Sequence, residues 1–549
     1  MPDLPTEPAA ATRPTPPEPR APTREKHPGE KHPGEKHPGE KHPGEKHWRA
    51  DLSMVGFGAL AGLSFPPLYL VPVLLVCAPA LLRAIGRART PWVAARRGFW
   101  FGFGLHVVGL YWITEAILFE AARLWWSVPL AVPALSAILA VFIAAPCAVA
   151  WATRPGWPRV LALAGAWTLA DIARAFVGTG FPWNLWGSVW EFPGLPGDVL
   201  IQPAAWIGVY GLTWLTVMLA CTPALPRRFW AAGAGVLVVW AGLGAWRLSW
   251  PDPAAPLGAD GKPIHVLLLQ GNIPEGQKWA RSLMIDIFDT YLRLTREAVA
   301  AAGPGPKIVV WPETASPFLL TADARARAAI AEAAGPDAVI LAGTVRFDAQ
   351  ERPRNSLTVI SSDGALLGEY DKWHLVPFGE FQPSWFPLPF QVVPGGGFAA
   401  GPGPRTLALP NGLPSAGPLI CYEAIYSAEM VDESDRPRWM VNVTNDAWFG
   451  DSSGPRQHLA AARLRAVEEG LPLLRAANTG ITAAFDGRGR ELARLPRAEA
   501  AFLPVQLPGA FNFTVYARLG LAIPVMLATV SLLIAFGSRR WVRPAETRR

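Results

Sequence analysis

The sequence predicts a two-part fold, in which a multi-span α-helical membrane domain precedes an α/β domain. Hydrophobic residues make up 51% of the 549 residues and charged residues only 17%, so the chain is more apolar than a typical soluble protein. Long apolar stretches occupy residues 52–247, as expected for membrane-spanning helices. From about residue 263 onward, short apolar runs alternate with helical patterns, which is typical of an α/β domain.

Residues 1–47 are expected to form a disordered, low-complexity tail. The unit Glu-Lys-His-Pro-Gly recurs from Glu25 to Gly44, and such a segment has nothing apolar to bury. Because five of the nine histidines lie in this tail, a metal-binding tract is the alternative. The tail lacks the apolar core of a signal peptide.

Residues 48–250 are expected to contain seven transmembrane helices, and an eighth is expected within residues 515–538. Most of the candidates have the ~20 residues that cross ~30 Å of hydrocarbon, although the first is short. The candidate spans are residues 52–64, 68–84, 98–118, 127–152, 160–177, 199–222, 229–247 and 519–536.

The arginines between the spans predict their orientation. The net charge of +7 is modest, and the basic residues gather in short loops, which favours membrane topology over nucleic acid binding. They follow the second, fourth and sixth spans and the last one, where residues 539–549 form a basic tail. The positive-inside rule therefore places both termini in the cytoplasm and the α/β domain outside it.

A Pro/Gly/Asp-rich linker, residues 251–262, leads to the α/β domain, residues 263–507. Its expected strands are 265–270, 308–310, 338–342, 356–360, 419–420 and 440–443, and its expected helices include 322–334 and 457–469. Two of these strands lead into polar residues: Cys421 ends one, and Glu313 follows another after Trp-Pro. A third polar stretch, the loop from Tyr370 to Glu380, carries Lys372.

Each of these residues also has an ordinary explanation. A free cysteine is often a small core residue, and Glu313 and the Lys372 loop can be surface features. If the three side chains converge, however, they form a nucleophile, a base and a cation. Glu313 would take the thiol proton if burial raised its pKa, and Lys372 would stabilise an oxyanion. His374 and His458 are alternative partners for a Cys-His dyad.

Glu313, Lys372 and Cys421, with the sequence motifs around them, resemble the Glu-Lys-Cys triad of the nitrilase (carbon–nitrogen hydrolase) superfamily. More narrowly, residues 50–540 are similar to its membrane branch, the apolipoprotein N-acyltransferase family. The resemblance rests on the motifs at residues 311–315, 372–380 and 420–423. Further matching motifs lie at residues 179–183, 270–274, 278–279, 445–450 and 478–482. The repeats of the amino-terminal tail have no counterpart in that pattern.

The resemblance implies an α-β-β-α sandwich for residues 263–507 and a ping-pong acyl transfer. Cys421 would take an acyl chain from a phospholipid as a thioester. It would pass that chain to the α-amino group of an apolipoprotein's amino-terminal diacylglyceryl-cysteine, the last step of lipoprotein maturation. The resemblance also implies supporting or substrate-binding roles for Trp279, Glu380, Tyr422 and Glu423.

The expected location is a bacterial cytoplasmic (inner) membrane with the α/β domain on the periplasmic side. We expect a monomer that contacts phospholipid, lipoprotein and bilayer, and needs no nucleic acid, cofactor or metal. Phe381, Trp385, Phe386 and Phe390 are expected either to form an apolar lid or to pack locally within their loop. The alternative functions are a membrane-anchored amidase for a small amide and a non-catalytic transporter or scaffold.

Overall fold

The computed structural model describes residues 43–118, 125–384 and 397–538. Contacts within the chain separate residues 1–47 from residues 48–549. Most of the predicted tail and all of residues 539–549 lie outside the described residues. The last five residues of that tail are helical, because helix α1 (Pro43–Gly62) begins at Pro43. The first turn of a helix tolerates proline, which has no N–H to leave unpaired.

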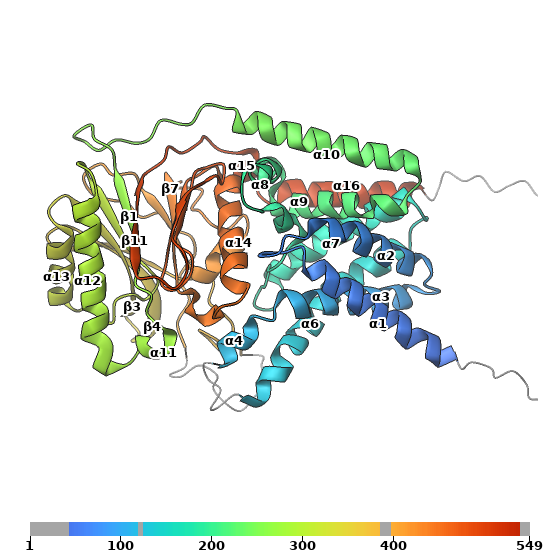
Figure 1. The fold of residues 1–549 in the computed structure, drawn as a ribbon, viewed down its shortest axis with the longest axis horizontal. Helices are drawn as coiled ribbons and strands as arrows, with labels where there is room; N and C mark the ends of the chain where they lie inside the picture. The colour runs from blue at the N-terminus through green and yellow to red at the C-terminus, as the bar shows by residue number, and fades with distance from the viewer. Residues whose placement is uncertain (1–42, 119–124, 385–396, 539–549) are drawn as a thin grey trace, which may run out of the picture. The chain divides into compact units, whose positions relative to one another are not determined.

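Apolar helices coincide with all eight predicted spans, although several boundaries differ. The helices in chain order are α1, α2 (Leu74–Gly86), α3 (Pro91–Gly109), α4 (Ile113–Leu118), α6 (Val128–Trp151), α7 (Trp157–Phe176), α8 (Leu195–Ile201), α9 (Ala204–Cys221), α10 (Arg227–Leu248) and α16 (Ala522–Gly537). The third predicted span is divided between α3 and α4, and the sixth between α8 and α9. Figure 1 shows these helices beside one another.

Within the described residues, three helices are both long and apolar enough to cross a membrane: Trp125–Trp151, Ala204–Ala224 and Arg227–Leu248. Helices α2 and α16 are shorter, with 13 and 16 residues. Helix α3 carries the buried Arg97, and α7 carries Asp171 and Arg174, which lower their hydropathy. The number of about eight transmembrane helices therefore stays a prediction.

Two mixed sheets form the α/β domain. The first has the strand order β11-β1-β2-β3-β4-β5 and the second the order β10-β9-β8-β7-β6. Their bounds are β1 (His265–Gln270), β2 (Lys307–Trp311), β3 (Ala338–Phe347), β4 (Pro353–Ile360), β5 (Leu366–Asp371), β6 (Ala416–Ile420), β7 (Trp439–Thr444), β8 (Leu473–Ala477), β9 (Ala483–Phe485), β10 (Glu491–Arg494) and β11 (Ala501–Gln506). Strands β1, β2 and β3 are parallel, as are β6, β7 and β8.

The two sheets are sandwiched between helices. In β1, Val266 and Leu268 pack toward the second sheet, whereas Leu267 and Leu269 pack against helices α12 (Met284–Ala301) and α13 (Ala324–Ala334). This alternation follows from the two-residue period of a strand. Helix α14 (Gly454–Glu469) covers the second sheet on its other face. Figure 1 shows α12 and α13 on one side and α14 on the other, an α-β-β-α arrangement.

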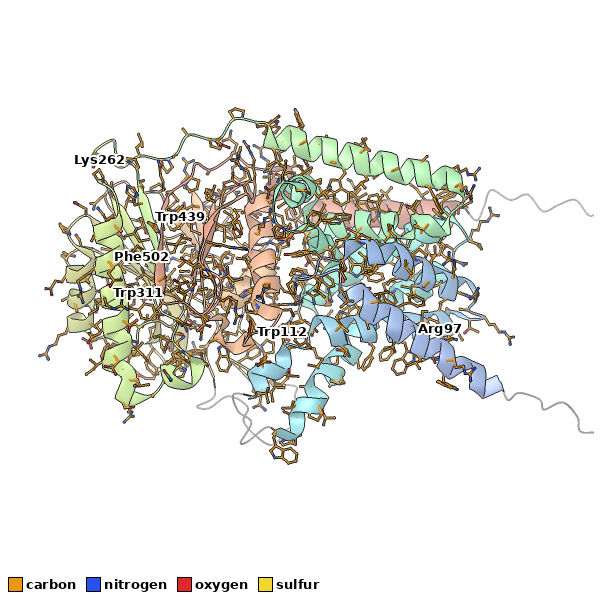
Figure 2. All side chains as sticks on the ribbon, in the orientation of Figure 1. Arg97, Trp112, Lys262, Trp311, Trp439 and Phe502 are labelled. Carbon is orange, nitrogen blue, oxygen red and sulfur yellow. The ribbon has the colours of Figure 1, made fainter. Side chains whose placement is uncertain are left out.

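The six strands predicted from apolar runs are all present, most with longer bounds. Buried tryptophans mark two of them: Trp311 ends β2 and Trp439 begins β7 (Figure 2). The prediction missed β5 and β8–β11. Strand β10 is largely exposed and polar, and β8 carries the buried Arg475, so neither shows the apolar run that the prediction used.

Candidate active site

The three predicted reactive residues all follow the carboxyl ends of strands. Glu313 follows β2, Lys372 follows β5 and Cys421 follows β6. Strand β5 is antiparallel to β4, which is antiparallel to β3, so β5 runs in the same direction as β2 and β3. The carboxyl ends of parallel strands are where α/β folds gather functional side chains.

Lys372 lies between two carboxylates. Its ammonium donates to Glu313 Oε1 at 3.1 Å and to Glu380 Oε1 at 2.9 Å. The side-chain amide of Asn355 donates to both acids, at 2.7 and 2.9 Å, and the backbone N–H of Asn445 donates to Glu313 Oε2 at 2.8 Å. Glu313 is 6% exposed and Lys372 is 1% exposed. A buried charge group of this kind is stable only because each charge is paired and hydrogen-bonded.

The pKa of Glu313 moves opposite to the prediction. Burial raises the pKa of this carboxyl, but the charges of Lys372 and Lys278, together with the hydrogen bonds, outweigh burial and hold it below its ordinary value. The same ion pairs hold the pKa of Lys372 above its ordinary value, although burial opposes them. Glu313 is therefore ionised at neutral pH and ready to accept a proton.

Cys421 lies on a strained turn. Strand β6 ends at Ile420, and a short 3-10 helix, η7 (Cys421–Ile425), begins at the cysteine. The backbone of Cys421 is left-handed, with φ of 52°, which is rare outside glycine and clusters at functional sites. Burial, then the charge of Glu313, raises the pKa of the thiol, while Lys372 and a hydrogen bond with Thr444 oppose this. The free thiol is thus neutral and needs a base.

Glu423 is fully buried. Its Oε1 accepts from Tyr370 OH at 2.9 Å and from the backbone N–H of Trp373 at 2.8 Å, and its Oε2 accepts from the backbone N–H of Ile420 at 2.6 Å. It therefore ties the chain beside Lys372 to the chain beside Cys421. Tyr422 also points away from open space, because its hydroxyl donates to Gly180 O at 2.9 Å.

Trp279 is 57% exposed, and its indole N–H donates to Glu275 Oε1 at 3.3 Å. It follows the short helix α11 (Glu275–Lys278), which directs Lys278 inward. The ammonium of Lys278 donates to the backbone carbonyl of Glu313 at 3.0 Å. Lys278, Asn355 and Asn445 were not predicted as site residues. Two of them stand in the motifs at 278–279 and 445–450, which were quoted without a role; Asn355 gave no signal in the sequence.

Neither predicted histidine serves as a base for the thiol. His458 Nε2 faces the backbone carbonyl of Cys421 at 2.9 Å, and its Nδ1 lies 2.9 Å from Asp446 Oδ1. His374 Nε2 lies 3.1 Å from Glu429 Oε2, and its ring stacks on Tyr426. Of the predicted lid residues, Phe381 is partly buried, and Trp385, Phe386 and Phe390 lie outside the described residues.

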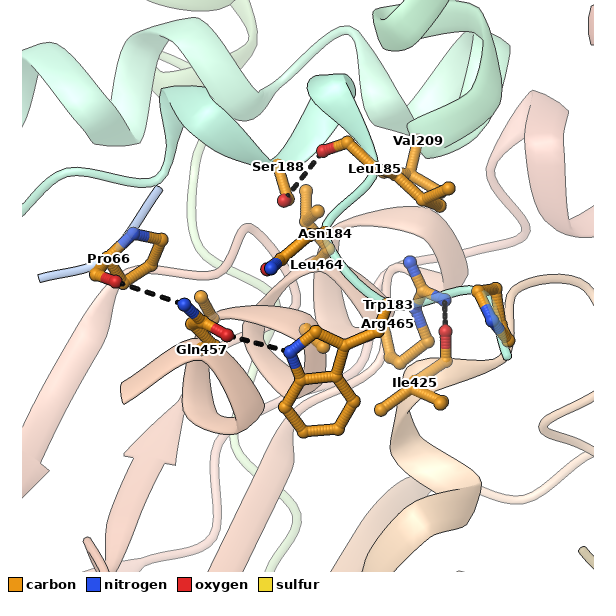
Figure 3. A pocket seen from close by; sticks show the side chains of 13 residues that line it. Pro66, Trp183, Asn184, Leu185, Ser188, Val209, Ile425, Gln457, Leu464 and Arg465 are labelled. Atoms are coloured by element: carbon orange, nitrogen blue, oxygen red, sulfur yellow. Dashed lines mark hydrogen bonds between the residues drawn. The ribbon is translucent and has the colours of Figure 1, made fainter. Parts of the chain in front are cut away.

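A cavity lies between α14 and the segment that follows α7 (Figure 3). It encloses about 400 Å³, open solvent included, and is lined by Trp183, Gln457 and Ile425 among others. Figure 3 shows Gln457 between Pro66 and Trp183; its amide donates to Pro66 O at 3.3 Å, and its Oε1 accepts from the Trp183 indole at 2.7 Å. Cys421 does not line it, so this cavity belongs to the junction with the apolar helices and not to the thiol.

Two family models match this chain. The model of the apolipoprotein N-acyltransferase N-terminal domain matches residues 57–222, and the carbon-nitrogen hydrolase model matches residues 269–508. The first covers most of the apolar helices, and the second covers both sheets.

Several relatives match this chain over most of its length. An apolipoprotein N-acyltransferase of Rhodopseudomonas palustris is 38% identical over 531 residues, covering 90% of this chain and 96% of the relative. That of Bradyrhizobium diazoefficiens is 40% identical over 526 residues, covering 90% and 95%. Among solved structures, a CN-hydrolase superfamily protein from Xanthomonas campestris aligns with 48% of this chain and 96% of its own, at 19% identity and a TM-score of 0.33.

Proposed function

The chain belongs to the apolipoprotein N-acyltransferase family, and we propose that it transfers an acyl chain from a phospholipid through a thioester at Cys421. The acceptor is the α-amino group of the diacylglyceryl-cysteine at the amino terminus of an apolipoprotein. The protein is a bacterial membrane acyltransferase of lipoprotein biosynthesis, as its relatives' names and its apolar helices indicate.

The observation that supports the site assignment is the buried Glu313–Lys372–Glu380 group, which follows strands of the first sheet and whose charges act on Cys421, at the end of β6 in the second sheet. In the first step, Cys421 Sγ attacks the ester carbonyl carbon while the Glu313 carboxylate takes the thiol proton. Lys372 stabilises the oxyanion of the tetrahedral intermediate. Glu313 then gives the proton to the leaving alkoxide, and the lysophospholipid departs.

In the second step, the neutral α-amine attacks the thioester carbonyl. Glu313 accepts a proton from the attacking nitrogen, the C–S bond breaks, and the thiolate recovers its proton from Glu313. The products are an amide-linked acyl chain and the free enzyme, and no oxidant, cofactor or metal is needed.

The predicted supporting residues act around this centre. Glu380 fixes the ammonium of Lys372, and Glu423 and Tyr422 hold the turn of Cys421. Trp279 stands exposed beside the buried Lys278, in a position to contact a lipid chain.

We further propose that about eight helices cross a cytoplasmic (inner) membrane, with both termini inside and the catalytic domain on the periplasmic side. The parts are residues 1–47, the membrane domain 48–250, the linker 251–262, the catalytic domain 263–507, the last helix 515–538 and the tail 539–549. The enzyme acts as a monomer, and its partners are phospholipid, diacylglyceryl-lipoprotein and bilayer. Reporter fusions at residue 255 and at the carboxyl terminus test the orientation.

The chemistry is tested by incubating the purified protein in liposomes with phospholipid carrying a labelled acyl chain. We expect a hydroxylamine-sensitive adduct on the wild-type protein, none on Cys421→Ala, and an unchanged adduct on the control Cys77→Ala. An adduct that persists on Cys421→Ala places the nucleophile elsewhere. Turnover of a small amide without lipid would instead favour the amidase. The match of residues 57–222 to the N-acyltransferase N-terminal domain gives that alternative no support.

A further inference from the structure

His458 is fully buried directly behind the turn that carries Cys421. It lies on α14, and its Nε2 is 2.9 Å from the Cys421 carbonyl oxygen. A carbonyl oxygen can only accept a hydrogen bond, so Nε2 carries a proton in either charge state of the ring. His458 therefore donates to the backbone of Cys421 and does not act on its sulfur.

The ring of His458 is held on its other side. Its Nδ1 lies 2.9 Å from Asp446 Oδ1, and Asp446 Oδ2 accepts from Arg475 Nη2 at 2.7 Å. Arg475 Nη2 also lies 3.2 Å from Nδ1. All three side chains are fully or almost fully buried, so none of them can exchange its partner for solvent. With Nε2 protonated, Nδ1 of the neutral ring accepts from Arg475 Nη2, and Nδ1 of the charged ring donates to Asp446. The Asp446–Arg475 pair therefore fixes the orientation of the imidazole in either charge state.

The turn that this ring supports is otherwise unfavourable. A non-glycine residue with φ of 52° persists only where its surroundings enforce that conformation. On the amino-terminal side of Cys421, Glu423 accepts from the Ile420 N–H. On the carboxyl-terminal side, the carbonyl of Cys421 is held by His458. The backbone is therefore held on both sides of the thiol.

We propose that His458 is a positioning residue for acyl transfer: its Nε2–H holds the Cys421 carbonyl, and with it the left-handed turn that presents the thiol to Glu313 and Lys372. This inference rests on the proposed role of Cys421 as the nucleophile. The charged groups that act on His458 are Asp446 and Arg475. Those that act on Cys421 are Glu313, Lys372 and Asp446.

The same ring contacts the segment after α7. The ring centroid of Trp183 lies 5.7 Å from that of His458, and the neighbouring Gln457 accepts from the indoles of Trp183 and Trp112. Figure 2 labels Trp112 beside α14. The register of α14 against the apolar helices therefore also sets the position of His458 under the nucleophile.

Two isosteric variants separate this role from a general effect on folding. The amide nitrogen of His458→Gln takes the place of Nε2 and can donate to Cys421, whereas that of His458→Asn takes the place of Nδ1 and cannot reach it. The readouts are the rate of thioester formation, KM for phospholipid, the rate of Cys421 alkylation resolved by peptide mass spectrometry, and the unfolding temperature. His265→Gln, at the start of β1, is the control.

We expect His458→Asn to slow both thioester formation and Cys421 alkylation by about tenfold per folded protein, with KM unchanged, and His458→Gln to recover most of the rate. Equal rates for the two variants, or a wild-type alkylation rate for His458→Asn, would overturn the proposal. If His458→Asn does not fold, Asp446→Asn takes its place in the comparison. This variant removes the carboxylate beside Nδ1 of His458, while the Nε2–H donor of the ring remains. Alkylation needs no lipid, so a failure of the acyl-transfer assay alone would count against the proposed function and not against this contact.

Discussion

The charges around Cys421 act in opposite directions on the two groups that exchange a proton. Lys372 and Lys278 keep Glu313 ionised, whereas burial and Glu313 itself keep the thiol protonated. The free enzyme therefore contains a carboxylate base and a neutral thiol, and the proton moves only as the sulfur attacks. For this reason the rate of thioester formation is not expected to decline between neutral pH and about pH 5, close to the ordinary pKa of a glutamate.

Replacing Lys278 tests this balance. Lys278→Met removes a positive charge beside Glu313, so the pKa of Glu313 rises and the base becomes protonated at higher pH. We expect thioester formation to fall several-fold at pH 5 relative to pH 8 in this variant and to stay level in the wild type. Single-turnover rates across this range measure it, with Lys278→Arg as the charge-preserving control. An identical profile for Lys278→Met would show that the acid limb does not depend on this charge.

Glu423 provides a prediction about stability. Burial raises its pKa to about 7, well above the value of an unfolded glutamate. A carboxyl with a raised pKa stabilises the fold below its unfolded pKa, and this contribution is lost as pH rises through about 7. Glu423→Gln removes the ionisable group. Its side-chain NH₂ would also face one of the N–H or O–H groups that donate to Glu423, which costs about 1–3 kcal/mol.

We therefore expect Glu423→Gln to unfold at a lower temperature than the wild type and to lose less stability between pH 5 and pH 8. Thermal unfolding followed by tryptophan fluorescence at several pH values measures both. A wild-type pH slope in the variant would assign the titration to another group.

At the scale of elements, the turn after β6 is attached to the segment between α7 and α8. The hydroxyls of Tyr422 and Tyr426 both donate to the carbonyl of Gly180, at 2.9 and 3.2 Å. A Cβ at Gly180 would lie 2.3 Å from the Ala175 carbonyl, so only glycine fits there. The nucleophile is thus held from the segment after α7 as well as by the sheet.

Helix α9 is interrupted at Gly208, whose φ of 64° and ψ of 176° belong to a region that is open almost only to glycine. A Cβ there would lie 2.2 Å from the ring of Tyr516. Gly208→Ala is expected to destabilise the protein by at least about 2 kcal/mol. Gly235→Ala in α10 is the control, since a Cβ there meets nothing within 4 Å. Unfolding temperatures in one detergent compare them, and equal temperatures would contradict the prediction.

At the scale of the whole described chain from Trp48 to Ser538, α14 connects the catalytic domain to the apolar helices. Gln457 accepts from two tryptophans near its start. Near its end, Glu468 Oε1 accepts from the Val209 N–H at 2.7 Å. That N–H is free because the break at Gly208 leaves α9 without a preceding turn. Glu468 also pairs with Arg465 and accepts from Ser427, which lies two residues after the turn Cys421–Ile425.

Replacing Glu468 tests this connection. Glu468→Leu leaves the Val209 N–H and Arg465 buried without their acceptor, so we expect a loss of about 1–3 kcal/mol. We also expect an added protease to cleave within residues 251–262 more readily than in the wild type. Glu469→Leu is the neighbouring control, because Glu469 pairs with Arg436 within the catalytic domain. Equal rates of cleavage in the two variants would place the coupling elsewhere.

Much of the fold follows from local pattern. Apolar runs located the apolar helices that coincide with the eight predicted spans, and six strands, because the period and length of apolar stretches reflect burial directly. The prediction missed the exposed strand β10 and the breaks in α3–α4 and α9, where the apolar character continues while the backbone turns at Gly208. It also missed Asn355, since a lone polar residue in a strand carries no local sign of what it faces.

The sequence by itself determined which residues are available for chemistry: a single cysteine after a strand, and an acid and a lysine in motifs that resemble those of one family. Only the tertiary structure decided their charge states and their supports. The pKa of Glu313 is lowered by two lysines that are both distant in sequence. The turn of Cys421 is held by Glu423 within the turn and by His458 and Gly180 from two other segments. Such effects depend on distances through the folded interior, where a few ångströms change the sign of a pKa shift, and no local pattern in the chain encodes those distances.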